Sequence, residues 1–152
     1  MTEDQTVAVP TRRRKSGIPT GNAGEYFVMG EMLRRGFDAQ LADRNTQGYD
    51  VLVGRSDEPS MHKVQVKTVR SAPWYVRAGD YAEPMLDRIT IYVLIGASDA
   101  NKAVRYFIAF NHELKDQLHR PADWSSTGFM PLRALTDFEN CWCKLKKLGS
   151  TT

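Results

Sequence analysis

The chain has 152 residues, of which 41% are hydrophobic and 10% aromatic, a content that suits one globular domain with a core of its own. Its net charge of +3 permits binding to nucleic acid without requiring it. No apolar run approaches the ~20 residues that span a bilayer, and the polar N-terminus does not resemble a secretory signal, so we expect a cytoplasmic protein with no membrane segment.

Residues 1–20 contain prolines and no apolar period, so we expect a flexible basic arm there, followed by a single domain at residues 21–152. The arm carries four consecutive cations, Arg12, Arg13, Arg14 and Lys15. Because such cations neutralise phosphates, this run is a candidate nucleic-acid contact. An ordinary solvated tail explains the same residues equally well.

The first helix is expected from Asn22 to Arg35, because apolar residues recur there at helical steps and Gly36 follows as a stop signal. Glu25 lies on the same stripe as the apolar residues, so its carboxylate is expected to face a sheet and to need a partner there. The simpler alternative is that Glu25, which follows Asn22 at the capping-box spacing, only completes the helix cap.

Three short strands are expected next, as a meander at residues 37–42, 49–54 and 62–69. The following stretch, residues 70–87, contains proline, glycine and aromatic residues and is expected to be irregular. Two aromatic residues of this stretch, Trp74 and Tyr75, are candidate nucleic-acid contacts.

The second half of the chain predicts two more strands and two helices. A hairpin of interior strands is expected at residues 89–95 and 104–110, which are rich in β-branched and aromatic residues. A short helix is expected at residues 112–118. A last helix is expected after Thr136, because Thr136 and Glu139 have the capping-box spacing.

Strand alternation gives the polar residues of the meander defined directions. Gln65 and Lys67 share one face, about 7 Å apart along their strand, and Asp50 is expected within cross-strand reach of both. With Glu25 from the helix, these side chains would form an oxygen-rich pocket suited to a divalent cation, beside a lysine. Each residue also has a simpler explanation: Asp50 in a turn, Gln65 in a hydrogen bond across the sheet, and Lys67 on a solvated face.

These segments resemble the PD-(D/E)xK nuclease superfamily, which has the restriction-endonuclease-like fold. The resemblance covers residues 22 to about 69 and rests on three motifs: Gly24-Glu25, Gly48-Tyr49-Asp50-Val51 and Val64-Gln65-Val66-Lys67-Thr68. It implies an α/β fold, a restriction-endonuclease-like sandwich in which a central mixed β-sheet of four to five strands is flanked by helices.

The resemblance implies that Glu25, Asp50, Gln65 and Lys67 are catalytic, with Asp50, Gln65 and Glu25 holding Mg²⁺ (or Mn²⁺). The sequence departs from the family pattern at two positions. Gln65 replaces the usual acid, a substitution that certain homing endonucleases and resolvase-like members accept and that should weaken metal binding. Tyr49 stands where the family usually has proline.

The expected function is therefore that of a metal-dependent endonuclease that hydrolyses DNA phosphodiester bonds and is restriction-, resolvase- or homing-endonuclease-like. A homodimer would let two sites address two strands. The alternative is a catalytically inactive nuclease-fold module that only binds nucleic acid or another partner. A third option is an enzyme that acts on another phosphate-containing substrate.

Overall fold

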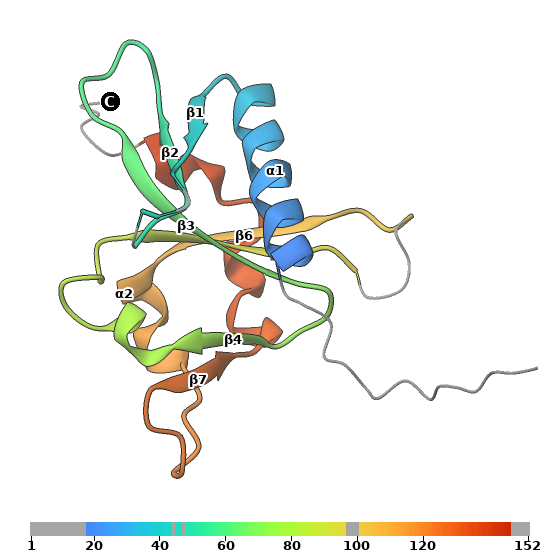
Figure 1. Cartoon of the computed structure of the whole chain (residues 1–152), viewed down its shortest axis with the longest axis vertical. Helices are drawn as coiled ribbons and strands as arrows, with labels where there is room; N and C mark the ends of the chain where they lie inside the picture. Colours follow the sequence, from blue (N-terminus) through green and yellow to red (C-terminus); the bar gives the residue numbers. More distant parts are fainter. Residues whose placement is uncertain (1–17, 44, 47, 97–100, 147–152) are drawn as a thin grey trace, which may run out of the picture.

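The computed structural model describes residues 18–43, 45–46, 48–96 and 101–146. These residues form a mixed sheet of five strands in the order β1-β2-β3-β5-β6, and a separate ribbon of two strands, β4 and β7. The strands span Asp38–Leu41 (β1), Val51–Gly54 (β2), His62–Val69 (β3), Trp74–Arg77 (β4), Ile89–Leu94 (β5), Arg105–Phe110 (β6) and Thr127–Met130 (β7). Figure 1 shows helix α1 (Ile18–Arg34) beside the meander and the ribbon at the other end of the molecule.

Helix α1 begins at Ile18, earlier than the expected start at Asn22. Pro19 lies in the first turn, where the missing amide has no helical partner to lose. Asn22 therefore lies inside the helix, and a cap formed with Asn22 does not explain Glu25. The predicted stop at Gly36 is confirmed, since this glycine has a φ of 87° just after the helix. Among the described residues no helix is long and apolar enough to cross a membrane.

The sheet contains the meander and the hairpin that the sequence predicts. Strands β1, β2 and β3 pair antiparallel in succession, and β6 pairs antiparallel with β5. Strand β5 runs parallel to β3, so the chain crosses over between these two strands. Strand β5 is interior as predicted, whereas β6 lies at the sheet edge. The middle of β6 is nevertheless buried, because the C-terminal segment packs against it.

The sheet separates two hydrophobic cores. The first lies on the α1 side and includes Val28 of α1 and Val64 of β3. The second lies on the other face, and its largest members are Trp74, Tyr92 and Phe107. Because alternate residues of a strand point to opposite faces, β3 can pack one set of side chains on each core.

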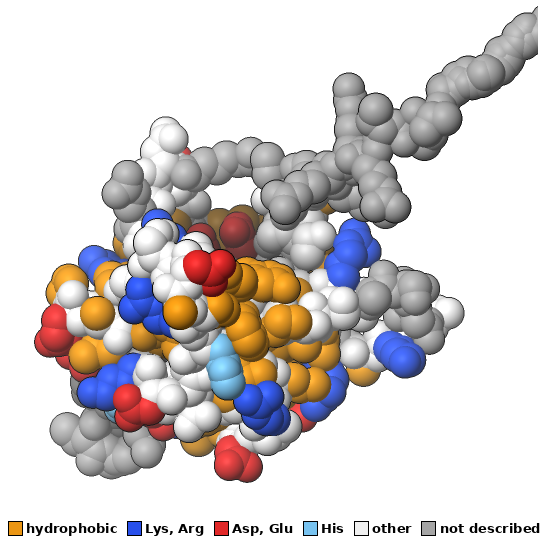
Figure 2. Space-filling view, turned by 90° about the horizontal axis from the view of Figure 1, so that it is seen from below, with side chains coloured by type: hydrophobic (Ala, Val, Ile, Leu, Met, Phe, Trp, Pro, Cys, Tyr) orange, Lys and Arg blue, Asp and Glu red, His pale blue; other side chains and the backbone are white. Residues whose placement is uncertain are grey.

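The stretch between β3 and β5 is more regular than the sequence predicts, since it contains β4 and the 3-10 turn η2 (Ala78–Tyr81). Strand β4 pairs antiparallel with β7, which comes from the second half of the chain. Figure 2 views this end of the molecule from below. Hydrophobic side chains gather on it, with Lys and Arg side chains around them.

The expectation of a C-terminal α-helix is wrong. The segment instead forms three short 3-10 turns, Leu132–Ala134 (η4), Thr136–Phe138 (η5) and Trp142–Lys146 (η6). Asn140 adopts a left-handed φ of 57°, which interrupts any continuous helix. Glu139 does not cap Thr136 but accepts two hydrogen bonds of 2.9 Å from Arg105 of β6. This bidentate pair fastens the segment to the sheet edge.

Candidate active site

Asp50 immediately precedes β2, at the point where β2 and β3 separate. Its amide donates to the carbonyl of Val64 at 2.8 Å, and its carboxylate oxygen Oδ2 accepts from the amide of Val66 at 2.8 Å. Alternate residues of a strand direct their backbone groups toward the same neighbour, so Val66 would pair with β2 if β2 continued. The Asp50 carboxylate takes that place. Asp50 is therefore fixed against β3, beside the segment that carries Gln65 and Lys67.

The edge of β3 is open on this side of the sheet. In the described residues, β2 pairs with β3 only from His62 to Val64, whereas β5 pairs with β3 as far as Val69. From Gln65 onward, β3 therefore has a neighbouring strand on one side only. The two faces of the sheet meet at this edge, and the Asp50 carboxylate lies at it.

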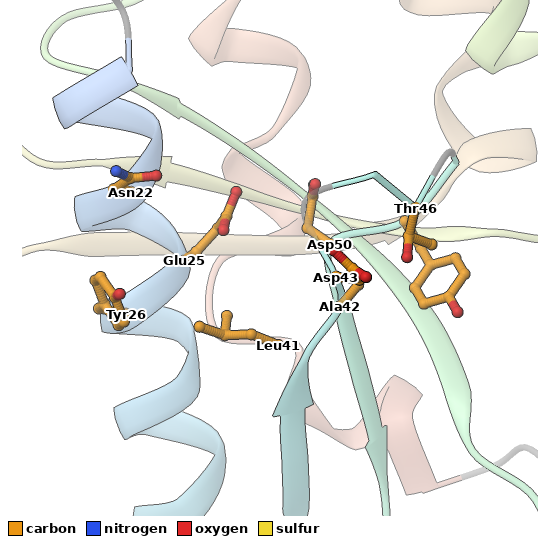
Figure 3. Close-up of a pocket in the computed structure, with 9 residues that line it drawn as sticks. Asn22, Glu25, Tyr26, Leu41, Ala42, Asp43, Thr46 and Asp50 are labelled. Atoms are coloured by element: carbon orange, nitrogen blue, oxygen red, sulfur yellow. The ribbon is translucent and has the colours of Figure 1, made fainter.

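Glu25 of α1 lines the same pocket as Asp50. The pocket has a volume of about 240 Å³ and includes a third carboxylate, Asp43. Figure 3 shows the side chains of Glu25 and Asp50 directed into it from α1 and from the start of β2. Helix α1 can lie this close to β3 because Gly24 has no side chain, since a Cβ there would lie 1.7 Å from the Oγ1 of Thr68.

Gln65 and Lys67 occupy the face of β3 that is turned away from Thr68 and α1. They lie beside Thr90 and Tyr92 of β5 in the strand register. Neither lines the pocket that Glu25 shares with Asp50. The side-chain oxygen of Gln65 is buried and has no hydrogen-bond partner among the described residues. A buried oxygen in this state is costly, and a ligand that binds it would remove the cost.

The amine of Lys67 is held by a residue that the sequence did not single out. Its Nζ lies 3.0 Å from the Oδ2 of Asp80 in η2, and the two side chains are only 15% and 4% exposed. Arg77 lies farther from the same carboxylate, at 3.7 Å. The backbone of Asp80 is fixed in turn, because the buried side chain of Asn111 donates to its carbonyl at 2.8 Å. Asp80 lies in the stretch expected to be irregular, where strand alternation gives no direction.

Two tyrosines adjoin this ion pair. The hydroxyl groups of Tyr81 and Tyr92 hydrogen-bond to each other, and Tyr92 lies beside Lys67 in the register of β5 and β3. Burial raises the pKa of both phenols, and the negative charge of Asp80 adds to the rise. Both tyrosines therefore stay protonated at neutral pH and bring no charge to the site.

A cluster of two cations and one aromatic ring adjoins Asp50, because the ring belongs to Tyr49, the preceding residue in the chain. The ring of Tyr49 has the Nζ of Lys63 at 5.3 Å and the guanidinium carbon of Arg88 at 5.9 Å from its centroid. Arg88 also donates to the carbonyl of Gly48 at 2.7 Å. Neither Lys63 nor Arg88 forms an ion pair with a carboxylate in the described part of the chain. Strand alternation could have identified Lys63 as a site residue, because Lys63 lies on the same face of β3 as Gln65.

The predicted nucleic-acid contacts differ in where they lie: one is buried, one is exposed, and four lie outside the described residues. Trp74 is 1% exposed, and its indole Nε1 donates to the carbonyl of Lys67 at 3.1 Å, so it is a core residue and not a surface contact. Tyr75 points to the other side of β4 and is 70% exposed. The four cations Arg12, Arg13, Arg14 and Lys15 lie outside the described residues.

The donor set can be compared with what a divalent cation requires. Within the described ranges, no three Asp, Glu, His or Cys side chains are grouped so as to hold a metal. The expected set differs, since it has two carboxylates, Glu25 and Asp50, and the amide oxygen of Gln65. Mg²⁺ accepts such oxygen donors and takes the rest of its ligands from water and substrate phosphate. The unpartnered oxygen of Gln65 fits this role.

Comparison with solved structures identifies the fold. The chain is similar to the bacterial homing endonuclease I-Ssp6803I, with 12% sequence identity, a TM-score of 0.54, and coverage of 88% of this chain and 95% of that one. It is also similar to Hjc, a Holliday junction resolvase from the archaeon Archaeoglobus fulgidus, with 16% identity, a TM-score of 0.48, and coverage of 76% and 86%. No family model and no curated protein matches the sequence. The central mixed sheet of five strands flanked by helices is the restriction-endonuclease-like fold expected from the sequence.

Proposed function

We propose that the chain is a metal-dependent endonuclease that hydrolyses phosphodiester bonds of DNA. The observation that carries the proposal is the position of Asp50, whose carboxylate binds the open edge of β3 and shares a pocket with Glu25. Gln65 and Lys67 belong to the same stretch of β3. The fold, shared with a homing endonuclease, supports this function.

In this proposal, Asp50, Glu25 and Gln65 would hold Mg²⁺ or Mn²⁺. The bound ion would polarise a phosphate oxygen and lower the pKa of a bound water. The hydrogen bond from Val66 keeps the Asp50 carboxylate in place before substrate arrives. Lys67 is a compact cation suited to stabilise negative charge that grows on the phosphate during attack. Asp80 fixes the position of its amine.

The Tyr49–Lys63–Arg88 cluster supports a polyanionic substrate at this site. Its two cations lack carboxylate partners among the described residues, so phosphates would supply the missing negative charge. Because Tyr49 directly precedes Asp50, a DNA strand that contacts this cluster would place a nearby phosphate at the pocket. The basic residues Arg12, Arg13, Arg14 and Lys15 would add further phosphate contacts.

A homodimer would provide two such sites, one for each strand of a duplex. Sedimentation of the protein with and without a DNA duplex measures this directly. A dimer on the duplex is the expected result, and one protomer per duplex together with cleavage of both strands would contradict the homodimer.

One observation favours the inactive module as a second candidate. Lys67 is paired with Asp80 at 3.0 Å, and the neighbouring metal ligand is the neutral Gln65. A neutral ligand weakens metal binding, and an amine neutralised by a carboxylate stabilises a transition state less. A chain that binds DNA tightly and never cleaves it would have these features.

The deciding experiment is cleavage of supercoiled and branched DNA with Mg²⁺, Mn²⁺ or EDTA. Asp50→Ala and Lys67→Ala should abolish cleavage. Matched controls are Asp57→Ala, which removes an exposed aspartate, and Lys115→Ala, which removes an exposed lysine. Both controls should cleave normally. Unchanged cleavage by the two site variants means a contaminating nuclease and refutes the proposal, whereas DNA binding by a wild-type chain that never cleaves supports the inactive module.

A further inference from the structure

The outer face of the β4–β7 ribbon is aromatic and exposed. Trp74 and Val76 of β4 point into the core, so Tyr75 and Arg77 point outward, and the Tyr75 side chain is 70% exposed. Phe129 of β7 lies opposite Tyr75 in the register. Tyr75 packs little of its surface against the domain, so folding alone does not account for an aromatic residue there.

Four aromatic rings form a continuous row across this face. The rings of Tyr75 and Trp124 have centroids 6.2 Å apart, and those of Trp124 and Phe129 are 6.1 Å apart. His119 stacks on Phe129 at 5.1 Å with an angle of 11° between the ring planes. These contacts hold the rings in fixed relative positions, which lowers the entropy lost when a flat ligand stacks on them.

Arginine side chains surround the row. Arg133 donates to the Nε2 of His119 at 2.9 Å, and Arg120 donates to the carbonyl of Ser125 at 2.6 Å, beside Trp124. The side chain of Arg77 is 72% exposed, and its guanidinium lies 3.7 Å from the carboxylate of Asp80. One exposed acid, Asp123, lies next to Trp124 in the chain. Figure 2 shows hydrophobic side chains beside Lys and Arg side chains at this end of the molecule, with Asp and Glu side chains among them.

We propose that this aromatic face, made of Tyr75, Arg77, His119, Trp124, Phe129 and Arg133, binds unpaired nucleotides of the DNA substrate. Bases would stack on Tyr75 and Trp124, and the arginines would contact the phosphates between them. The combination of rings with a π face and flanking cations fits single-stranded nucleic acid better than a duplex, whose bases are already stacked.

The connection to the candidate active site supports this assignment. Strand β4 follows β3 after a short turn, and the buried Trp74 of β4 donates to the carbonyl of Lys67. Arg77 of the face and Lys67 of the site also contact the same carboxylate, Asp80. The inference rests on the proposed nuclease function, and it assigns the unpaired part of the substrate to one side of the cleavage site.

The test measures binding without cleavage, in EDTA and on an Asp50→Ala background, with a labelled single strand, a forked duplex and a blunt duplex. Tyr75→Ala should weaken binding to the single strand and the fork about 5- to 150-fold, the range for loss of one stacked base. Tyr75→Phe keeps the ring and should bind normally. The matched control is Phe27→Ala, which removes a ring of α1 that is 44% exposed.

Arg77→Gln should lower the slope of log affinity against log salt by about 0.7 on the single strand, as expected for one lost phosphate contact. The inference is overturned if Tyr75→Ala binds the single strand as tightly as Phe27→Ala does, or if it weakens the blunt duplex equally. Since these assays need no metal and no cleavage, their result can refute the aromatic-face proposal without refuting the nuclease proposal. A wild-type chain that binds no nucleic acid at low salt would refute both.

Discussion

The ion pair between Lys67 and Asp80 gives a prediction about stability that does not depend on any activity. Asp80→Ala leaves the amine of Lys67 without a carboxylate in a place where its side chain is only 15% exposed. Removing one partner of a buried pair destabilises a protein by about 3–5 kcal/mol, because the other charge stays buried. For a chain of this size, that loss lowers the melting temperature by about 6–20 °C.

The variant that removes the amine, Lys67→Met, should reduce the free energy of unfolding less than Asp80→Ala does. In Lys67→Met, the carboxylate of Asp80 keeps Arg77, whose guanidinium lies 3.7 Å away. The double variant Lys67→Met with Asp80→Leu removes both charges at once and should regain most of the loss, ending within about 1 kcal/mol of the wild type. The structure therefore predicts an order of stability, with Asp80→Ala lowest.

Urea denaturation of the four proteins, followed by circular dichroism, gives their free energies of unfolding. The matched control is the exposed pair of Arg55 and Asp57, at 3.3 Å, whose removal should cost about 0–1 kcal/mol. A cost below about 1 kcal/mol for Asp80→Ala, or a double variant no more stable than Asp80→Ala, would show that the pair is not buried as described.

Three further predictions follow from single contacts. Gly24→Ala should reduce stability and DNA cleavage together in urea and nicking assays, because its Cβ would clash with Thr68 and displace α1, and Thr68→Ala should restore part of both. Asn111→Ala should destabilise the chain by about 2–4 kcal/mol in urea denaturation, because the carbonyl of Asp80 and other buried polar groups would lose their hydrogen-bond partner. Burial lowers the pKa of His62 from its usual 6.5, so the unfolded chain takes up a proton that the folded chain does not, and stability should fall as the pH drops through about 6.5. His62→Gln should flatten that part of the curve of stability against pH.

The helix and strands that surround the candidate site were predictable because local patterns control them. Apolar periodicity predicted α1, and short strand-like runs separated by turn residues predicted the meander. Strand alternation also gave the shared direction of Gln65 and Lys67, and the cross-strand position of Asp50. The patterns worked here because β3 pairs regularly with β5 from Val64 to Val69, a stretch that contains Gln65 and Lys67.

The errors have one physical cause, which is that distant contacts overrode local signals. Thr136 and Glu139 have the spacing of a capping box, but Glu139 binds Arg105 from another part of the chain. Trp74 looked like an exposed loop residue, but it fills the second core and bonds to the carbonyl of Lys67. Asp80 was missed for the same reason, since only the crossover between β3 and β5 brings it to Lys67.

In the proposed nuclease, the open edge of β3 would let residues on two faces of the sheet act on one phosphate. Glu25 approaches from the α1 side, whereas Gln65 and Lys67 belong to the other face, and a complete sheet would keep them apart. Because β2 stops pairing with β3 at Val64, a phosphate at this edge can be reached from both sides at once.

The open edge depends on Asp50, because its carboxylate accepts the hydrogen bond that a neighbouring strand would otherwise accept. Asp50→Asn keeps an oxygen that can accept from Val66 but removes the charge, so it should fold like the wild type and lose cleavage. Asp50→Leu loses both and should also be less stable in urea, by about 1–3 kcal/mol for the unpaired amide. Equal stability of the two variants would mean that the hydrogen bond from the Val66 amide to Asp50 does not stabilise the open edge of β3, and would refute this account of the edge.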